Sequence, residues 1–234
     1  MNSKYLYLTV NLASIIIPFL ASFYPRVPFY KKWKWVWPAI LIPAIPFLIW
    51  DEYFSRLGVW GFNPEYLTGI YIGSLPLEEV LFFICIPYAC VFTYFALNHL
   101  IKRDLLCLSH EIISSILIVF LFIAGVYFIE KAYTATTFIL LACFIAYLVL
   151  KKRARFLGRF YVSFLAILIP FFIVNGILTG SFIAGEVVWY DNSENLGIRL
   201  GTIPLEDVFY GMLLLMMNVT LYELLQSSGK HKSR

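Results

Sequence analysis

Charged residues are scarce in this sequence: only 14% of its 234 positions are Asp, Glu, Lys or Arg, whereas 61% are hydrophobic. A mean hydropathy of +0.81 excludes an ordinary soluble domain and indicates a polytopic membrane protein. An open sheet cannot span lipid, and the apolar runs lack the alternation of a membrane barrel. The predicted fold class is therefore all-α.

The motifs of many cofactor and metal sites are also missing. The four cysteines form no CxxC pair and the three histidines are scattered, so the sequence predicts no metal site. Neither GxGxxG nor GxxxxGK[ST] occurs, which excludes a nucleotide loop of the usual kind. No Asp-rich DxxxD site for a magnesium diphosphate lies on the apolar runs, which argues against a membrane prenyltransferase. The last apolar run contains no lysine, which excludes a retinal Schiff base there.

What the chain does contain is a set of apolar runs long enough to cross a hydrocarbon core of about 30 Å at ~1.5 Å per residue. They cover residues 5–24, 33–50, 75–97, 112–129, 133–150, 160–179 and 203–225. The first run has no small-x-small cleavage site after it, which favours a retained span over a signal peptide. We therefore predict an integral membrane protein with seven transmembrane helices.

Lysine and arginine gather on one side of these predicted spans. With the N-terminus outside, fourteen of the 18 Lys and Arg residues fall in inner segments, at residues 26–34, 102–103, 151–159 and 230–234. This positive-inside bias predicts an outer N-terminus and a cytoplasmic C-terminus. The net charge of +4 then reflects topology and gives no reason to expect a nucleic-acid partner.

Three stretches of the first half recur in the second half. The pairs are GSLPLEEV (73–80) with GTIPLEDV (201–208), VWGFNPEYLTG (59–69) with VVWYDNSENLG (187–197), and PFLIWD (46–51) with PFFIVN (170–175). We interpret them as an internal duplication, with three-helix repeats at 1–98 and 132–234. A linker at 99–131 holds the fourth span and restores the chain direction, so the repeats are predicted to be parallel.

This arrangement predicts that the loops before the third and seventh spans lie on the same, outer side. We expect single cysteines introduced within residues 58–73 or 186–201 to react with a membrane-impermeant thiol reagent added to intact cells, in a variant without its native cysteines. Labelling of only one of the two loops would contradict the parallel arrangement of the repeats.

Each repeat places two acids at the mouth of an apolar run. They are Glu78 and Glu79 in the first repeat, and Glu206 and Asp207 in the second. A carboxylate at mid-bilayer costs about 3 kcal/mol or more, so such a pair lies at the water line or serves chemistry. With Pro76 and Pro204 at the first helical position, the first acid of each pair could also cap the helix. Repetition of both acids in both halves favours chemistry.

Adjacent helical residues point about 100° apart, so one acid of each pair can face the interior while the other faces the rim. Aromatic rings one turn further on can desolvate an inward carboxyl and stabilise a cation. The candidates for this role are Phe82, Phe83 and Tyr210, joined by Trp60 and Asn63 from the loop. Asp51 is a further candidate because it ends the second predicted span and pairs with Asn175 in the other repeat.

Two repeats, each with an aromatic and Asn-containing loop followed by P-L-E-E or P-L-E-D, resemble the heterodimeric-type lycopene cyclases of bacteria, archaea and fungi. The two small subunits are here fused into one chain. The resemblance identifies the motif acids as catalytic, and we expect Glu78 or Glu206 to be the proton donor, with Glu79 or Asp207 as base or partner. It implies lycopene and other acyclic carotenoids as substrates, within the lipid bilayer, and is compatible with a homo-oligomer.

The implied reaction is the cyclisation of lycopene ends to β-ionone rings, giving γ- or β-carotene. A general acid protonates the terminal double bond, an internal alkene captures the cation, and a base removes a ring proton. Hydrogen content does not change, so the enzyme would be an intramolecular lyase or isomerase. The sequence requires no cofactor, although a flavin in a non-redox role is compatible with it.

The main alternative is a transporter in which the paired acids relay protons or cations. That alternative predicts a polar path through the inner half of the bundle. The inner ends of the third and seventh spans read VFTYFAL (91–97) and MMNVTLYELL (216–225), with little ionisable character beyond Glu223. A carotenoid-binding protein without catalysis would leave the four acids unexplained.

Overall fold

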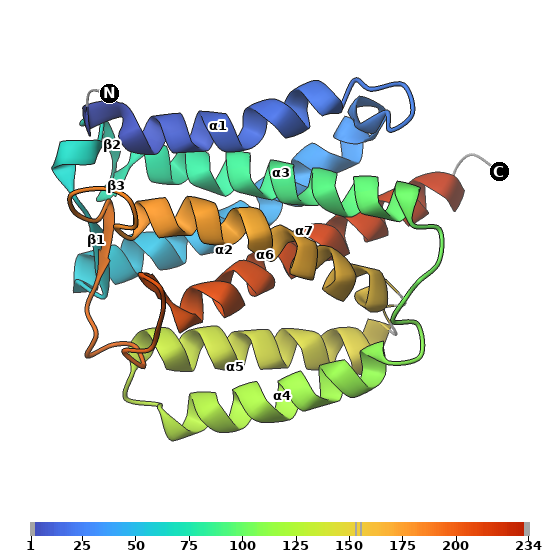
Figure 1. The fold of residues 1–234 in the computed structure, drawn as a ribbon. Helices are drawn as coiled ribbons and strands as arrows, with labels where there is room; N and C mark the ends of the chain where they lie inside the picture. Colours follow the sequence, from blue (N-terminus) through green and yellow to red (C-terminus); the bar gives the residue numbers. More distant parts are fainter. Residues whose placement is uncertain (1–2, 153, 155, 232–234) are drawn as a thin grey trace.

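The computed structural model describes residues 3–152, 154 and 156–231, which form seven α-helices lying along a common direction (Figure 1). They are α1 (Leu6–Ala21), α2 (Trp33–Leu57), α3 (Leu77–Leu100), α4 (His110–Tyr127), α5 (Ala132–Tyr147), α6 (Leu157–Leu178) and α7 (Leu205–His231). Short 3-10 turns at Ser3–Tyr5, Phe29–Lys32 and Pro64–Tyr66, and a π-helical turn at Leu148–Lys152, extend or connect them. The predicted all-α class is confirmed.

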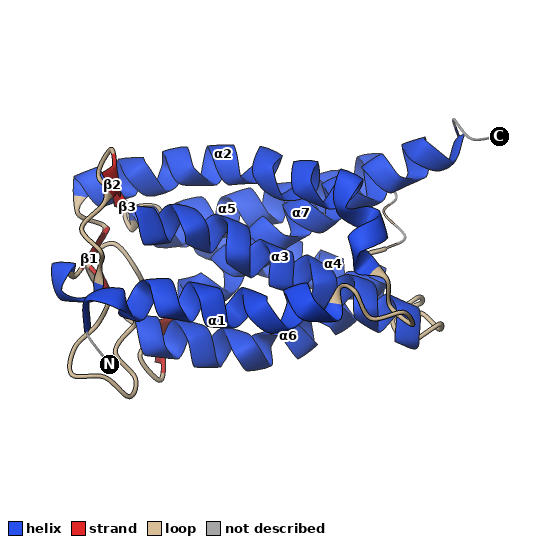
Figure 2. Ribbon diagram, turned by 90° about the horizontal axis from the view of Figure 1, so that it is seen from above, coloured by secondary structure: helices blue, strands red, loops and turns tan. Residues whose placement is uncertain are grey.

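Each predicted apolar run overlaps one of these helices. Six of the helices in the described part of the chain are long and apolar enough to cross a membrane, and α1, with 16 residues, is apolar but shorter. The two ends of the chain lie at opposite ends of the bundle, as expected for an odd number of spans (Figure 2). Of the basic residues used to predict orientation, Arg153, Arg155, Lys232 and Arg234 lie outside the described residues.

The second helix is longer than predicted. It ends at Leu57 rather than at residue 50, so Asp51 lies within the helix and is buried. Glu52 and Arg56 form an ion pair of 2.6 Å at helical spacing, which supports the added turns. Gly58 then ends the helix in the left-handed conformation, with φ of 75°.

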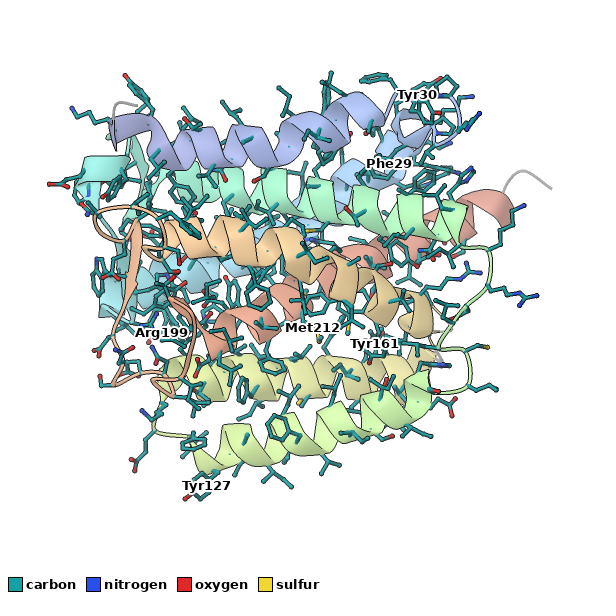
Figure 3. The ribbon with its side chains drawn as sticks, viewed as in Figure 1. Phe29, Tyr30, Tyr127, Tyr161, Arg199 and Met212 are labelled. Atoms are coloured by element: carbon teal, nitrogen blue, oxygen red, sulfur yellow. The ribbon has the colours of Figure 1, made fainter. Side chains whose placement is uncertain are left out.

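The two sets of three helices pack in corresponding ways. α1 packs on α3, as α5 packs on α7. The middle helices cross over, because α2 packs on α7 and α6 packs on α3. α4 packs mainly on α5 at the edge of the bundle, where Tyr127 points away from the other helices (Figure 3). The domain boundaries at residues 98 and 132 stay a prediction.

Short strands cover one end of the bundle (Figure 1). The duplicated motif forms a tight hairpin each time: β2 (Tyr71–Ile72) pairs with β3 (Leu75–Pro76), and β5 (Arg199–Leu200) with β6 (Ile203–Pro204). Gly73 and Gly201 open the two-residue turns with φ of 67° and 68°, a conformation that glycine adopts without strain. β1 (Trp60–Phe62) pairs with β4 (Val188–Tyr190), which joins the two halves of the chain.

The motif prolines were predicted at the first position of the third and seventh helices, but they lie immediately before these helices. Pro76 and Pro204 end the hairpin strands, and the helices begin at the following leucines. The hairpin requires an extended proline, since the N–H of Leu77 donates to the carbonyl of Ile70 at 2.8 Å, and Pro76 has ψ of 150°. The two acids of each motif therefore occupy the second and third helical positions.

Candidate active site

A cavity of about 480 Å³ lies between α1, α3, α6 and α7. Its lining on α3 extends from Glu79 to Thr93, a helical rise of about 21 Å, so the cavity is long. The end near the short strands carries the polar groups, which belong to Tyr7, Asp51, Glu79, Tyr133, Asn175, Tyr190, Asp207 and Tyr210. Further along, the wall is mainly aliphatic and aromatic, with Ile86, Ile167 and Leu214 as examples.

The cavity opens sideways between α1 and α6, which lie next to one another (Figure 2). Ile17 on α1 and Ile173 on α6 both line the cavity, and they are also 73% and 57% exposed on the outer surface. Ala13 and Pro170 combine the same two properties. In a bilayer this mouth would face hydrocarbon, the solvent in which an apolar substrate dissolves.

The second acid of each motif lies on the cavity wall. Oε2 of Glu79 accepts a hydrogen bond from the hydroxyl of Tyr7 at 2.5 Å. Oε1 of Glu79 has no hydrogen-bond partner in the part of the chain that the structure describes. Asp207 accepts from the hydroxyls of Tyr133, at 2.6 Å, and Tyr190, at 3.0 Å, one on each oxygen.

The first acid of each motif lies behind this wall. Glu78 and Glu206 are fully buried and do not line the cavity. Oε1 of Glu78 accepts from the backbone N–H of Thr68 at 2.7 Å, and Oε1 of Glu206 accepts from that of Leu196 at 2.8 Å. Both contacts reach ten residues back and fasten the preceding loop to the start of a helix. The donor role that the sequence assigns to Glu78 or Glu206 stays a prediction, but neither carboxyl faces the cavity.

A third acid, Asp51, joins the two cavity-facing carboxyls from α2. The indole N–H of Trp60 donates to its Oδ1 at 2.5 Å. Its Oδ2 is buried and has no partner among the described residues. Asn175, the residue equivalent to Asp51 in the other half, also lines the cavity. The repeat alignment therefore identified both residues before the structure placed them together.

The predicted aromatic residues divide between the wall and the surrounding core. Phe82, Tyr210 and Trp60 line the cavity. Phe83 is buried against Phe47, with ring centroids 6.2 Å apart, and does not reach the cavity. Asn63 is also outside the wall, because its side chain accepts from the N–H of Glu65 and caps the 3-10 turn.

Sequence reasoning missed the three tyrosines that hold the acids. Tyr7 and Tyr133 each lie in the first turn of the first helix of a repeat. An alignment of these two helices would have revealed that the two tyrosines correspond. Tyr190 comes from β4, outside the spans. Burial, followed by the neighbouring Asp207 carboxylate, raises the pKa of Tyr190 well above its ordinary value, so its hydroxyl stays protonated and donates. Arg199, at the same end of the bundle, lies 5.4 Å from the Tyr190 ring centroid (Figure 3).

Two kinds of comparison identify relatives of the chain. The family model described as lycopene cyclase matches residues 4–97 and 130–225, leaving out the segment that contains α4. A bifunctional lycopene cyclase/phytoene synthase of Aspergillus niger is 32% identical over 71 residues, which are 30% of this chain and 12% of that protein. The protein of the same description from Phycomyces blakesleeanus is 44% identical over 64 residues, 26% of this chain and 10% of the relative.

The chain thus aligns with only about a tenth of the length of these curated relatives. No solved structure matches it. The family match is much broader, since its two segments together cover most of the sequence and contain both acidic motifs. The acids of both motifs also lie in one helix bundle. Because the family model matches most of the sequence, the chain belongs to the lycopene cyclase family.

Proposed function

We propose that this chain is a lycopene β-cyclase that closes β-ionone rings at the ends of lycopene by acid catalysis, without a redox step. The observation that carries the proposal is the cavity itself: Glu79 and Asp207, from equivalent positions of the two repeats, lie at the polar end of a long apolar cavity. If the end of an acyclic carotenoid enters from lipid, it would meet carboxyl groups only at the polar end of the cavity, where its terminal double bond would lie.

The hydrogen bonds suggest different roles for the two carboxyls. Oε1 of Glu79 has no partner among the described residues, so a proton on that oxygen can be presented to the substrate alkene. Both oxygens of Asp207 already accept hydrogen bonds from tyrosines, which suits the carboxylate that stabilises the cation and later removes a ring proton. This proposal moves the donor role from Glu78 or Glu206 to Glu79, which follows Glu78 in the first motif.

The wall around these acids suits a carbocation. Aromatic rings present negative faces, and those of Phe82, Trp60 and Tyr210 line the same end of the cavity. The mainly apolar lining beyond them excludes water, which would otherwise capture the cation before the alkene does. A proton relay would instead need polar groups along the inner part of the wall, where Ile86, Leu214 and Leu215 lie.

The proposal is tested by the source of the hydrogen that starts the reaction. A carboxylic acid exchanges its proton with water between turnovers, so cyclisation in D₂O should place one solvent deuteron on each ring formed. The hydrogen lost from the ring should come from the substrate. Mass spectrometry of the pigment made by the purified chain in lipid vesicles, supplied with lycopene, measures both. Rings formed without solvent deuterium would exclude an exchangeable acid as donor.

Two further measurements distinguish the cyclase from a proton or cation relay. Conversion of lycopene to a ring-containing pigment in a lycopene-accumulating bacterium would support the proposal. Proton or cation flux into vesicles without any conversion of lycopene would overturn it in favour of the relay.

A further inference from the structure

The two halves of the chain differ at the positions that decide how much space lies beside their acids. In the aligned segments PFLIWD and PFFIVN, Trp50 of α2 corresponds to Val174 of α6. Counting from the motif glycines, Phe83 of α3 corresponds to Gly211 of α7. At both pairs one half has a large aromatic side chain and the other a small residue.

The small members of both pairs lie on the cavity wall. Val174 and Gly211 line the cavity, and so does Phe171, whose ring lies near Gly211. A Cβ atom at Gly211 would be 3.6 Å from Cε2 of Phe171, so a side chain at this position would extend into the space that Phe171 borders. The cavity therefore exists where the second half of the chain supplies valine and glycine.

The large members fill the corresponding place in the other half. The ring centroid of Trp50 lies 5.0 Å from that of Tyr210 and 5.7 Å from that of Phe47. Phe47 also contacts Phe83, at 6.2 Å between centroids, and Tyr210, at 5.1 Å. Phe47 is the repeat equivalent of Phe171, so this aromatic cluster occupies the space that would mirror the cavity.

Resting on the proposed function, we infer that the chain has a single catalytic cavity that takes one carotenoid end per binding event, and that Trp50 and Phe83 close its repeat-related counterpart. Both Glu79 and Asp207 serve the one open cavity. The remainder of a bound carotenoid leaves through the mouth between α1 and α6, beyond the reach of either acid. A second ring therefore requires the monocyclic carotenoid to dissociate and return with its other end.

Filling the open cavity tests the inference. Val174→Trp copies into α6 the residue that α2 carries, and we expect ring formation and carotenoid binding to fall by roughly a hundredfold, since small displacements of a substrate cost that much. Leu165→Trp is the matched control, because Leu165 lies on the same helix, is 64% exposed and does not line the cavity. It should keep activity within about twofold. A Val174→Trp protein that keeps about half of the activity would reveal a second working site and overturn the inference.

A measurement on the unaltered protein does not depend on how that variant folds. Isotope-labelled lycopene is supplied together with an excess of unlabelled monocyclic product, and the label in each carotenoid is followed with time. We expect the labelled monocyclic carotenoid to appear free in the lipid, as the end product or as a pool that mixes with the unlabelled one before any second ring forms. Labelled bicyclic product formed at once, without mixing, would overturn the inference. A wild-type chain that forms no rings counts against the proposed function instead.

Discussion

Replacing Glu79 by Gln should abolish most ring formation, with a loss of roughly 10² to 10⁴ in turnover, the range expected for a general acid. Glutamine keeps the size of the side chain and can still accept the hydrogen bond from Tyr7. It cannot deliver a proton to an alkene. The initial rate of ring formation by purified protein in lipid vesicles measures the effect, with size-exclusion chromatography as the check on folding.

The neighbouring residue supplies the matched control. Glu78→Gln makes the same chemical change one position earlier, on a carboxyl that faces the loop at Thr68 rather than the cavity. The amide oxygen can still accept from that backbone N–H, so activity should stay within about fivefold of the wild type. The opposite order, with Glu78→Gln inactive and Glu79→Gln active, would return the donor role to Glu78 and refute the role of the cavity-facing acid.

Asp207→Asn should cause a second loss of at least about a hundredfold, for a different reason. The carboxylate that balances the developing cation would become a neutral amide, whose single oxygen can accept from only one of Tyr133 and Tyr190. Glu206→Gln is the control, because Glu206 accepts from the N–H of Leu196 behind the wall. Initial rates of ring formation again give the comparison.

The double variant with Glu79→Gln and Asp207→Asn tests whether the two acids act as a unit. Groups that serve one reaction path are strongly non-additive, so the double variant should be little slower than the slower single variant. Single variants that each keep about half of the activity, with an inactive double variant, would indicate that the two carboxyls act on separate substrate ends, in contradiction to a shared cavity.

Much of the architecture followed from the sequence because lipid allows few solutions. Seven apolar runs predicted seven helices, and each overlaps a helix of the structure. The short strands were not predicted, since segments of two or three residues carry no periodic signal. The extra turns of α2 were missed because charged residues end the apolar run at position 50, whereas Glu52 and Arg56 pair along the continuing helix.

The sequence named all four motif acids, but it did not indicate that Glu79 and Asp207 line the cavity while Glu78 and Glu206 lie behind its wall. The repeated motif predicted the helix starts to within one position, because the hairpins hold Pro76 and Pro204 in strands. Adjacent helical side chains point about 100° apart, and which acid of each pair faces the cavity depends on how the helix packs against its neighbours. The tyrosine partners come from elements that are distant in the chain, and their contact with the acids depends on packing that composition does not encode.

The crossed packing of the middle helices bears on how the protein is made. α2 packs most extensively on α7, and α3 packs on α6, so each of these two helices has a neighbour that is synthesised later. When the first three helices have left the ribosome and entered the membrane, α2 can pack on α3 but still lacks α7, and lipid must take the place of α7. Helices inserted early associate later with those that follow, so the cavity can be completed only when the last helix has been synthesised and inserted.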